Sequence, residues 1–416
     1  MTDLQVRPAP TLQGRNRQHF GYWAAAMTYL ALQAFTTVPS PLYARYAQRD
    51  HLTPLVITVV YAAYAVGVSA SLVMAGHLSD LFGRRPVLGA ALIVDVLSAL
   101  TFLVWPALPG LFVARVLCGL AVGVTSSTAT AYLGELYAAR RPTGQTRRLQ
   151  VLLTAVSIGG LGVGPLIAGL TTLLVGRPLT APYVVMLVVF AACGIALMWA
   201  PETRCPGVPR PGYHVQRISV PRRARRHYVA ALTGVATVFA LFGLFIGLAG
   251  TILGSQLGHP SIALTGVLLF VVYAAGVASV VVTIRLGRAR QVATAGVLVF
   301  VGLALLVLST WLSTSTPVFL ALFLCAGSAI GAGGSTLFTI SLAVVNAVAP
   351  RDRQAETLAG FFLAGYVALS VPVIGVGLAL QSLSVRVTLV GFAVLVTVAA
   401  YGALSGLLRT TEPIHE

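Results

Sequence analysis

Charged side chains that could pair with one another gather in one short segment of the first half, residues 76–88, which we call the hinge segment. It reads Gly-His-Leu-Ser-Asp-Leu-Phe-Gly-Arg-Arg-Pro-Val-Leu, and its charged residues and flanking glycines are Gly76, Asp80, Gly83, Arg84 and Arg85. The glycines permit a tight reversal of the backbone. A carboxylate and two guanidinium groups this close can pair internally or clamp the end of a neighbouring helix. The alternative is that the arginines only anchor helix ends.

Two further charges, Asp95 and Arg115, stand inside long apolar runs. If these runs are membrane helices, about 8 Å separates the two residues along the membrane normal, which an arginine side chain can just cover. A charge inside hydrocarbon needs a partner or a water-filled cavity. A carboxyl whose guanidinium partner comes and goes would load and release a proton. Both are therefore candidate coupling residues, although a buried aspartate can also simply tie helices together.

Two more carboxylates lie at the ends of apolar runs. Glu135 precedes a pair of arginines, and Glu356 follows closely after another pair. We interpret both as ion pairs at the membrane surface that could relay to Asp80, and as secondary candidates for coupling.

A third cluster combines small residues with proline at Gly160, Gly164, Pro165 and Gly169. Small residues let helices approach closely, and proline leaves a carbonyl without its helical donor, which favours a bend. Ordinary small-residue packing is the alternative.

The composition excludes a soluble protein. Of the 416 residues, 57% are hydrophobic and only 9% are charged, against about 25% charged in soluble domains. Apolar runs recur from residue 21 to residue 408, each of about twenty residues, the length that crosses a bilayer. An integral membrane protein follows.

The positive charge predicts orientation. All 27 basic residues are arginine and the net charge is +17. Alternate connections place 22 arginines on one side and four on the other, namely Arg45, Arg49, Arg177 and Arg386. By the positive-inside rule both termini are cytoplasmic, which suits a plasma (inner) membrane protein. Because the charge is spread over these connections, we expect no nucleic-acid partner.

Catalysis, metals and cofactors are not expected. Cysteines at 118, 193, 205 and 325 are too widely spaced for a zinc site or a disulfide framework. Histidines and carboxylates form no cluster, and the G-x-x-x-x-G-K-[ST] loop of phosphate-driven pumps does not occur. A sensor would need a soluble output domain, whereas the largest polar insert is residues 201–226.

The apolar runs predict twelve membrane helices in two groups of six. The first group lies near residues 21–38, 54–75, 87–105, 110–134, 149–174 and 181–200, and the second near 229–254, 262–284, 292–312, 316–345, 356–379 and 386–408. The predicted divisions are a cytoplasmic tail (1–20), a bundle (21–200), a cytoplasmic linker (201–226), a second bundle (227–408) and a tail (409–416).

The two halves also repeat one another. Tyr-Ala-Val-Gly-Val at 64–68 matches Tyr-Ala-Ala-Gly-Val at 273–277, and Pro165 matches Pro372, at offsets of 209 and 207 residues. Similar offsets indicate a duplicated bundle, as in transporters that rock about a central site.

The hinge segment resembles the loop signature of the major facilitator superfamily, Gly-x-Leu-x-Asp-Arg-x-Gly-Arg-Arg/Lys, and departs from it at Leu81. Residues 111–119 resemble a second family signature, in which glycine follows an arginine by four residues. Residues 160–169 resemble the family's antiporter motif, with Ala168 in place of one glycine and Val151 where a more distant glycine is expected.

This resemblance implies an all-α fold of two six-helix bundles related by a pseudo-twofold axis, and a gating role for the hinge segment. It points to the twelve-helix drug:proton antiporters, although their carboxylate in the first helix is missing here. The family's cavity is lined by the first, fourth, seventh and tenth helices, whose candidates are Tyr29, Gln33, Ser126, Ser127, Thr130, Phe242, Phe245, Ser335, Thr336 and Phe338.

We therefore hypothesise a secondary transporter, functional as a monomer in the lipid bilayer, that exports small amphipathic compounds in exchange for protons. The alternative is a proton-linked symporter or facilitator that imports a metabolite such as a sugar or organic acid.

Overall fold

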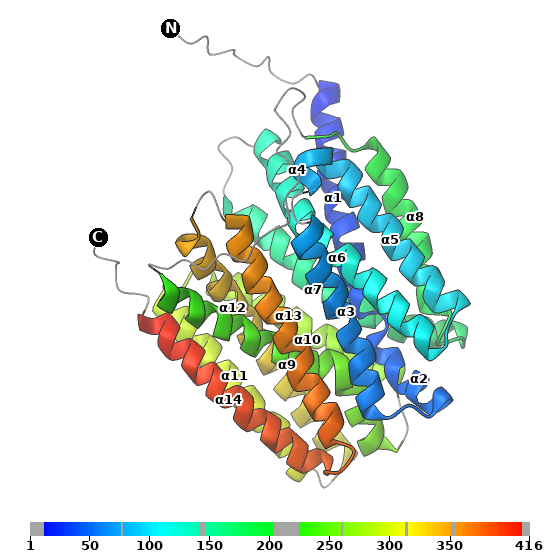
Figure 1. The fold of residues 1–416 in the computed structure, drawn as a ribbon, viewed down its shortest axis with the longest axis vertical. Coiled ribbons are helices and arrows are strands. Elements are labelled where there is room, and N and C mark those ends of the chain that lie inside the picture. The colour runs from blue at the N-terminus through cyan, green and yellow to red at the C-terminus, as the bar shows by residue number, and fades with distance from the viewer. Residues whose placement is uncertain are drawn as a thin grey trace.

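The computed structural model describes residues 12–75, 78–140, 146–203, 224–258, 261–312, 315–350 and 354–409. These ranges are almost entirely helical, and the long helices lie side by side (Figure 1). The first half contains α1 (Leu12–Thr37), η1 (Ser40–Leu42), α2 (Tyr43–Asp50), α3 (Pro54–Ala75), α4 (Leu78–Phe82), α5 (Arg84–Val104), α6 (Leu108–Arg140), α7 (Thr146–Val175) and α8 (Ala181–Trp199). The second half contains α9 (Arg225–Leu257), α10 (Ile262–Thr283), α11 (Arg288–Trp311), α12 (Thr316–Val348), α13 (Gln354–Ala379) and α14 (Val385–Arg409).

Eleven helices in the described ranges are long and apolar enough to cross a membrane, namely every long helix except α1. With 26 residues α1 has the length, but its hydropathy is lowered by buried polar residues such as Thr28 and Gln33. It packs against α6, α7 and α8 inside the first half. The predicted all-helical membrane fold is confirmed, with α1 as the twelfth long helix.

The two halves are built alike. In the first, α6 packs against α3 and α5, and in the second, α12 packs against α10 and α11. Glycines at matching positions of the repeat bring the helices together. A Cβ at Gly67 of α3 would lie 2.2 Å from a carbonyl oxygen of α6, and one at Gly276 of α10 would lie 3.0 Å from a carbonyl oxygen of α12.

The halves contact each other mainly through two equivalent pairs, α7 with α10 and α3 with α13, and to a smaller extent through α2, η1 and α3 against α9. We call the end of the molecule that carries the hinge segment the hinge end and the opposite one the far end. The closest contacts lie in the far part of both pairs, and those of α7 with α10 continue to mid-helix, where a Cβ at Gly162 would lie 2.9 Å from the Cβ of Tyr273. A Cβ at Gly266 would lie 2.3 Å from the carbonyl oxygen of Pro165, and one at Gly377 would lie 2.3 Å from Thr58 Oγ1.

The structure corrects several predicted boundaries. Helix α1 begins at Leu12, inside the predicted tail, and α6 continues to Arg140 instead of ending near residue 134. Helix α9 begins at Arg225, two residues inside the predicted linker, whose residues 204–223 lie outside the described part of the chain.

The segment after α1, predicted to be an outer loop, instead forms η1 and α2. Tyr43 and Tyr46 are buried on one side of α2, whereas Arg45 is exposed on the other. This amphipathic pattern explains why α2 lies against α3 and α9 instead of projecting into solvent.

Candidate functional site

A guanidinium group is buried in the middle of the first half. Arg115 of α6 is 1% exposed, and its Nη1 donates a hydrogen bond of 2.8 Å to the carbonyl oxygen of Thr36. Thr36 lies in the last turn of α1, where carbonyl groups lack helical donors and carry the negative end of the helix dipole. Arg115 therefore caps the far end of α1.

Aromatic faces surround the same group. The guanidinium carbon of Arg115 lies 4.6 Å from the ring centroid of Tyr64 and 5.6 Å from that of Tyr61, both on α3. Gly119, one turn after Arg115, makes this possible, because a Cβ there would lie 2.1 Å from the carbonyl oxygen of Tyr64. We call Arg115, Tyr61 and Tyr64 the aromatic cage.

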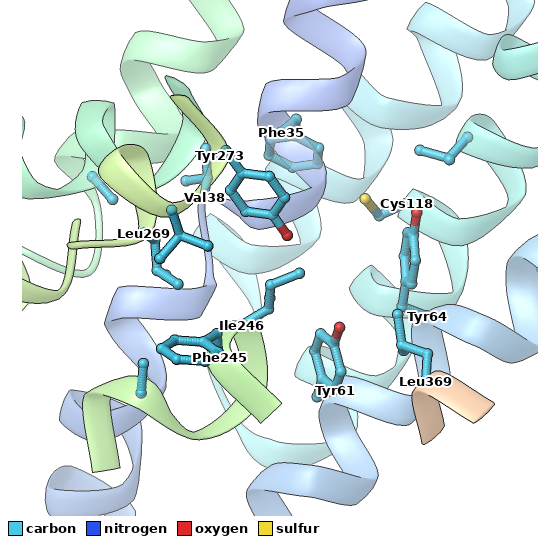
Figure 2. Packing of buried hydrophobic residues seen from close by; sticks show 14 of the residues in the cluster. Phe35, Val38, Tyr61, Tyr64, Cys118, Phe245, Ile246, Leu269, Tyr273 and Leu369 are labelled. Atoms are coloured by element: carbon cyan, nitrogen blue, oxygen red, sulfur yellow. The ribbon is translucent and has the colours of Figure 1, made fainter. Parts of the chain in front are cut away.

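The second half completes the surroundings of the cage. The ring of Tyr366 on α13 meets that of Tyr64 edge-on, with centroids 6.0 Å apart. Tyr273 of α10 is an electrostatic neighbour of Tyr61, and Figure 2 shows the hydroxyl groups of both pointing into the same region. The cage therefore lies where the two halves meet.

Several buried polar atoms near the cage have no hydrogen-bond partner among the described residues. They are Arg115 Nε, Tyr43 Oη, Tyr273 Oη and Gln33 Oε1. Buried polar groups in folded proteins nearly always have partners. This region therefore retains hydrogen-bonding capacity that a polar ligand could use.

Some predicted cavity residues lie close to one another or to the surroundings of the cage. Tyr29 is buried beside Ser126 and Thr130, and the ring of Phe242 lies 5.2 Å from that of Tyr273. The Cβ of Gln33 lies against Gly160 of α7.

The other predicted cavity residues pack elsewhere. Phe245 lies against Phe323, and Phe338 lies in a cluster of phenylalanine rings of the second half. Thr336 shares a hydrogen bond of 2.8 Å with Ser279 of α10. Ser335 is fully buried beside Gly276, and the exposed Ser127 donates a hydrogen bond within its own helix.

Four tyrosines around the cage were not predicted, namely Tyr61, Tyr64, Tyr273 and Tyr366. They lie on α3, α10 and α13, whereas the resemblance directed attention to the first, fourth, seventh and tenth helices. One signal in the sequence could have found two of them, because Tyr64 and Tyr273 open the repeated pentapeptide.

The second candidate coupling residue, Asp95 of α5, is also fully buried. Both carboxylate oxygens lack a hydrogen bond of normal geometry, and the thiol of Cys118, a weak donor, lies beside them. The reach of Arg115 to Asp95 that the sequence allowed is not made, since no ion pair joins them in the described structure. Arg115 extends instead toward the end of α1 and the tyrosine rings.

The hinge segment forms a compact network. Arg84 pairs with Asp80 at 2.7 Å and with Glu135 of α6 at 3.1 Å, and its Nη1 donates to Ser79 Oγ at 2.6 Å. Arg85 donates more weakly to the carbonyl oxygen of Ala200, at 3.4 Å. Gly76 lies outside the described residues. All the described contacts of this network remain inside the first half.

Glu202 completes this network and was not predicted, because it falls in the segment assigned to the linker. Its carboxylate oxygens accept the backbone N–H groups of Arg84 and Arg85, each at 3.0 Å. A carboxylate at the N-terminus of α5 also meets the positive end of the helix dipole. Gly83 has a φ of 103°, and a Cβ there would lie 2.8 Å from Glu202 Oε2.

The glycine and proline cluster of α7 faces two neighbours. A Cβ at Gly164 would lie 2.0 Å from a carbonyl oxygen of α1, and one at Gly169 would lie 3.2 Å from Ala263 of α10. Because Pro165 has no N–H, the carbonyl oxygen of Leu161 loses its helical donor. The hydroxyl group of Thr37 on α1 donates to that oxygen instead, at 2.8 Å.

Glu356 lies in the first turn of α13. No ion pair links it to another described residue, and the arginines expected beside it, at 351 and 353, lie outside the described ranges.

Comparisons with known proteins agree with this architecture. The family model for the Major Facilitator Superfamily matches residues 23–371. The human organic anion transporter MFSD10 (TETRAN) has a similar fold, with a TM-score of 0.62 and 14% identity over 93% of this chain and 99% of that one.

Two curated relatives are similar over shorter stretches, both from Bacillus subtilis (strain 168). An uncharacterized MFS-type transporter, YybF, is 27% identical over 116 residues, 28% of each chain. An arabinose-proton symporter is 33% identical over 90 residues, 22% of this chain and 18% of the symporter. The chain thus matches less than a third of the length of either relative.

Proposed function

Since this chain belongs to the major facilitator superfamily and is a multi-pass membrane transporter, we propose that it exports small amphipathic compounds in exchange for protons. The observation that carries this proposal is the aromatic cage at the contact between the halves. A cation faced by aromatic rings, with unused hydrogen-bonding atoms around it, suits a neutral or weakly anionic amphipathic cargo.

Transport would proceed by alternating access, with the two halves tilting about the cage. In support, the contact between α7 and α10 is closest in the far part of both helices, where a Cβ at Gly266 would lie 2.3 Å from the carbonyl oxygen of Pro165. The described contacts of the hinge segment remain within one half. Opening the far end would free the hinge segment to engage the second half. In this mechanism Gly76, Asp80, Gly83, Arg84 and Arg85 form the gate at the hinge end.

The proposed exchange of cargo for protons is supported by α7, whose residues 160–169 resemble the family's antiporter motif. Some glycines of α7 lie against α1 and others lie against α10. Among these glycines, Pro165 interrupts the backbone hydrogen bonds of α7. A bend at this point would couple movement of the two halves to the end of α1, which Arg115 caps. We assign Gly160, Gly164, Pro165 and Gly169 to this bend.

Asp95 is the proposed proton carrier. It is buried, it has no hydrogen bond of normal geometry among the described residues, and Arg115 is an electrostatic neighbour. A change in that neighbour during tilting would change the proton affinity of the carboxyl. Glu135 and Glu356 are secondary candidates, of which Glu135 is already bound by Arg84.

The replacement Asp95→Asn tests proton coupling. With a cargo found by screening toxic compounds and metabolites against cells that express or lack the protein, proteoliposomes containing the variant should lose gradient-driven accumulation. They should keep cargo exchange, because the cage is intact. Glu412→Gln, which changes a carboxylate in the predicted C-terminal tail, is the control and should keep both activities. Unaltered accumulation in Asp95→Asn would discard this role.

Direction is tested in oriented vesicles. Export predicts that an imposed proton gradient drives cargo against the flow of protons. Co-movement of cargo and protons would instead support the second candidate, a proton-linked importer of a metabolite such as a sugar or organic acid. That candidate is favoured by one observation, the local similarity to an arabinose-proton symporter.

The same proposal places the protein in the plasma membrane, as a functional monomer, with the hinge end and both termini on the cytoplasmic side. The arginine asymmetry supports this placement. Labelling of single cysteines at the two ends with an impermeant reagent in intact cells tests it.

A further inference from the structure

The far face of the protein has few arginines, but most of them lie close together. Only four of the 27 arginines belong to far-side connections in the sequence. Three of the four line one cavity of about 530 Å³ at the far end of the first half. Its lining residues are Arg45, Gln48, Arg49, Arg177, Pro178, Leu179 and Thr180.

Two separate elements form this cavity. Helix α2 contributes Arg45, Gln48 and Arg49, and the turn between α7 and α8 contributes Arg177. Gly176, with a φ of 68°, reverses the chain immediately before Arg177. The fold therefore brings together arginines that are about 130 positions apart in the sequence.

One of these three arginines is already neutralised. Nε and Nη2 of Arg49 each lie 2.7 Å from an oxygen of Asp50, and Nη2 also donates to the carbonyl oxygen of Pro106. The hydrogen bonds from Arg49 hold the pKa of the Asp50 carboxyl below its ordinary value, so that it stays ionised and paired.

The other two arginines are not neutralised. Arg45 and Arg177 form no ion pair with any described carboxylate, and the cavity lining contains no acidic residue. Nη1 of Arg45 donates to Gln48 Oε1 at 3.5 Å, which leaves the amide nitrogen of Gln48 as a further donor. The cavity thus presents two free positive charges and additional donors, beside the apolar surfaces of Pro178 and Leu179.

We propose that this cavity binds the carboxylate or phosphate head of a small organic anion. Guanidinium groups bind such heads through paired hydrogen bonds, and the apolar lining would contact the body of the molecule. That the cavity binds such an anion does not depend on the proposed function. Its role in transport does: we assign the cargo to the weak organic acids, which the cavity would bind as anions at the far side. Guanidinium groups bind the ionised form of such an acid in preference to the neutral form, and the ionised form crosses lipid poorly.

Helix α2 also connects the cavity with the aromatic cage. Arg49 lies over the ring of Tyr46, with its guanidinium carbon 5.2 Å from the centroid. Tyr43, one turn earlier, is an electrostatic neighbour of Arg115. One face of a short helix therefore contacts the anion site, and the other reaches the buried cation.

Binding can be tested without a gradient. The protein is placed in phosphatidylcholine nanodiscs with the tryptophans at 23, 199 and 311 replaced by phenylalanine. Trp105 then remains as the energy donor, directly before Pro106, to which Arg49 donates. The probes are 1-pyrenebutyrate and its uncharged analogue 1-pyrenebutanol.

Arg45→Gln combined with Arg177→Gln should weaken binding of pyrenebutyrate about tenfold or more and leave pyrenebutanol unchanged. The matched control is Arg386→Gln, which removes the fourth far-side arginine. Arg386 lies over the Trp311 ring, at 5.9 Å, in the second half. The affinity of the Arg386→Gln variant for pyrenebutyrate should stay within about twofold of that of the parent protein.

Equal affinity in the double variant, or an equal loss in Arg386→Gln, would overturn the proposal in favour of diffuse charge. A lipid site is tested by adding phosphatidylglycerol to the nanodiscs. If this lipid displaces the probe and copurifies only when both arginines are present, the cavity binds a lipid head group and the organic-anion assignment is wrong. Loss of proton coupling in transport assays would leave these results untouched, so the two proposals fail separately.

Discussion

Arg115 keeps its charge inside the protein through a carbonyl oxygen and two aromatic faces, without a carboxylate in ion-pair distance among the described residues. This arrangement depends on the shape of the guanidinium group. Its plane can lie over a ring while its edge donates to Thr36, and its weak hydration lowers the cost of burial. A lysine ammonium group is more strongly hydrated and has no plane to lie over a ring, so it would make these contacts at a higher cost of burial.

Arg115→Lys should therefore lower the initial transport rate on the order of tenfold, or about 1.4 kcal/mol. Rates in proteoliposomes measure this, with melting of the purified protein recorded to exclude unfolding. Arg386→Lys, at a more exposed cation–π contact, is the control and should keep the full rate. An unaffected Arg115→Lys would show that positive charge alone suffices.

Sequence reasoning found Arg115 and Asp95 but not the contacts that Arg115 makes in this structure. Axial distance along helices was predictable from residue numbers, whereas the direction of a side chain depends on which helices are neighbours. The end of α1 and two rings of α3 offered Arg115 acceptors that the numbers alone could not reveal.

At the scale of single helices, glycines and prolines are matched to particular neighbours. Pro165 leaves the carbonyl oxygen of Leu161 without a helical donor, and Thr37 of α1 supplies one. Gly83 adopts a backbone conformation that other residues avoid and lies against Glu202. Its counterpart in the second half, Gly287, has a φ of −62° and open space around it.

Thr37→Val should destabilise the protein by about 1–2 kcal/mol, because it leaves a buried carbonyl unsatisfied. In a Pro165→Ala background the same change should cost about 1 kcal/mol less, since the new N–H can bond to Leu161. Unfolding of the four variants in detergent gives this coupling energy. Thr28→Val, which removes a bond within α1 and a contact with Cys193 of α8, should show no coupling to position 165. Purely additive effects at Thr37 would contradict the account.

Gly83→Ala should destabilise the hinge end by about 1–3 kcal/mol, from backbone strain and the contact with Glu202. Gly287→Ala is the matched control and should change stability by less than about 0.5 kcal/mol. Thermal unfolding of both variants measures the difference. Equal values would show that the hinge glycine is not under conformational constraint.

At the scale of the molecule, the long helices and most of their boundaries followed from apolar runs alone, because a bilayer fixes how long such a run must be. Repeats in the sequence indicated two similar halves. What they could not indicate was the surface shared between the halves, since contacts of α7 with α10 and of α3 with α13 depend on how one half is rotated against the other. All four tyrosines in and around the cage, Tyr61, Tyr64, Tyr273 and Tyr366, lie on α3, α10 and α13.

Tilting of the halves predicts that a cross-link at the far end stops transport. A Cβ at Gly377 would lie 3.1 Å from the Cβ of Thr58, close enough for a disulfide after a small adjustment. In a background without the four native cysteines, oxidised Thr58→Cys/Gly377→Cys should lose transport, and reduction should restore it. Full transport by the cross-linked protein would show that the halves do not part there.

The touching backbones of α3 and α6 carry a consequence for every state of the cycle. Gly67 and Gly119 leave no room for one helix to slide past the other without a collision. The two helices should therefore move as one rigid body that carries the guanidinium group of Arg115 and the rings of Tyr61 and Tyr64. As access to the cage alternates between the two sides of the membrane, only the part of its surroundings supplied by Tyr273 and Tyr366 would then move relative to it. The binding surface on the first half would keep a constant shape.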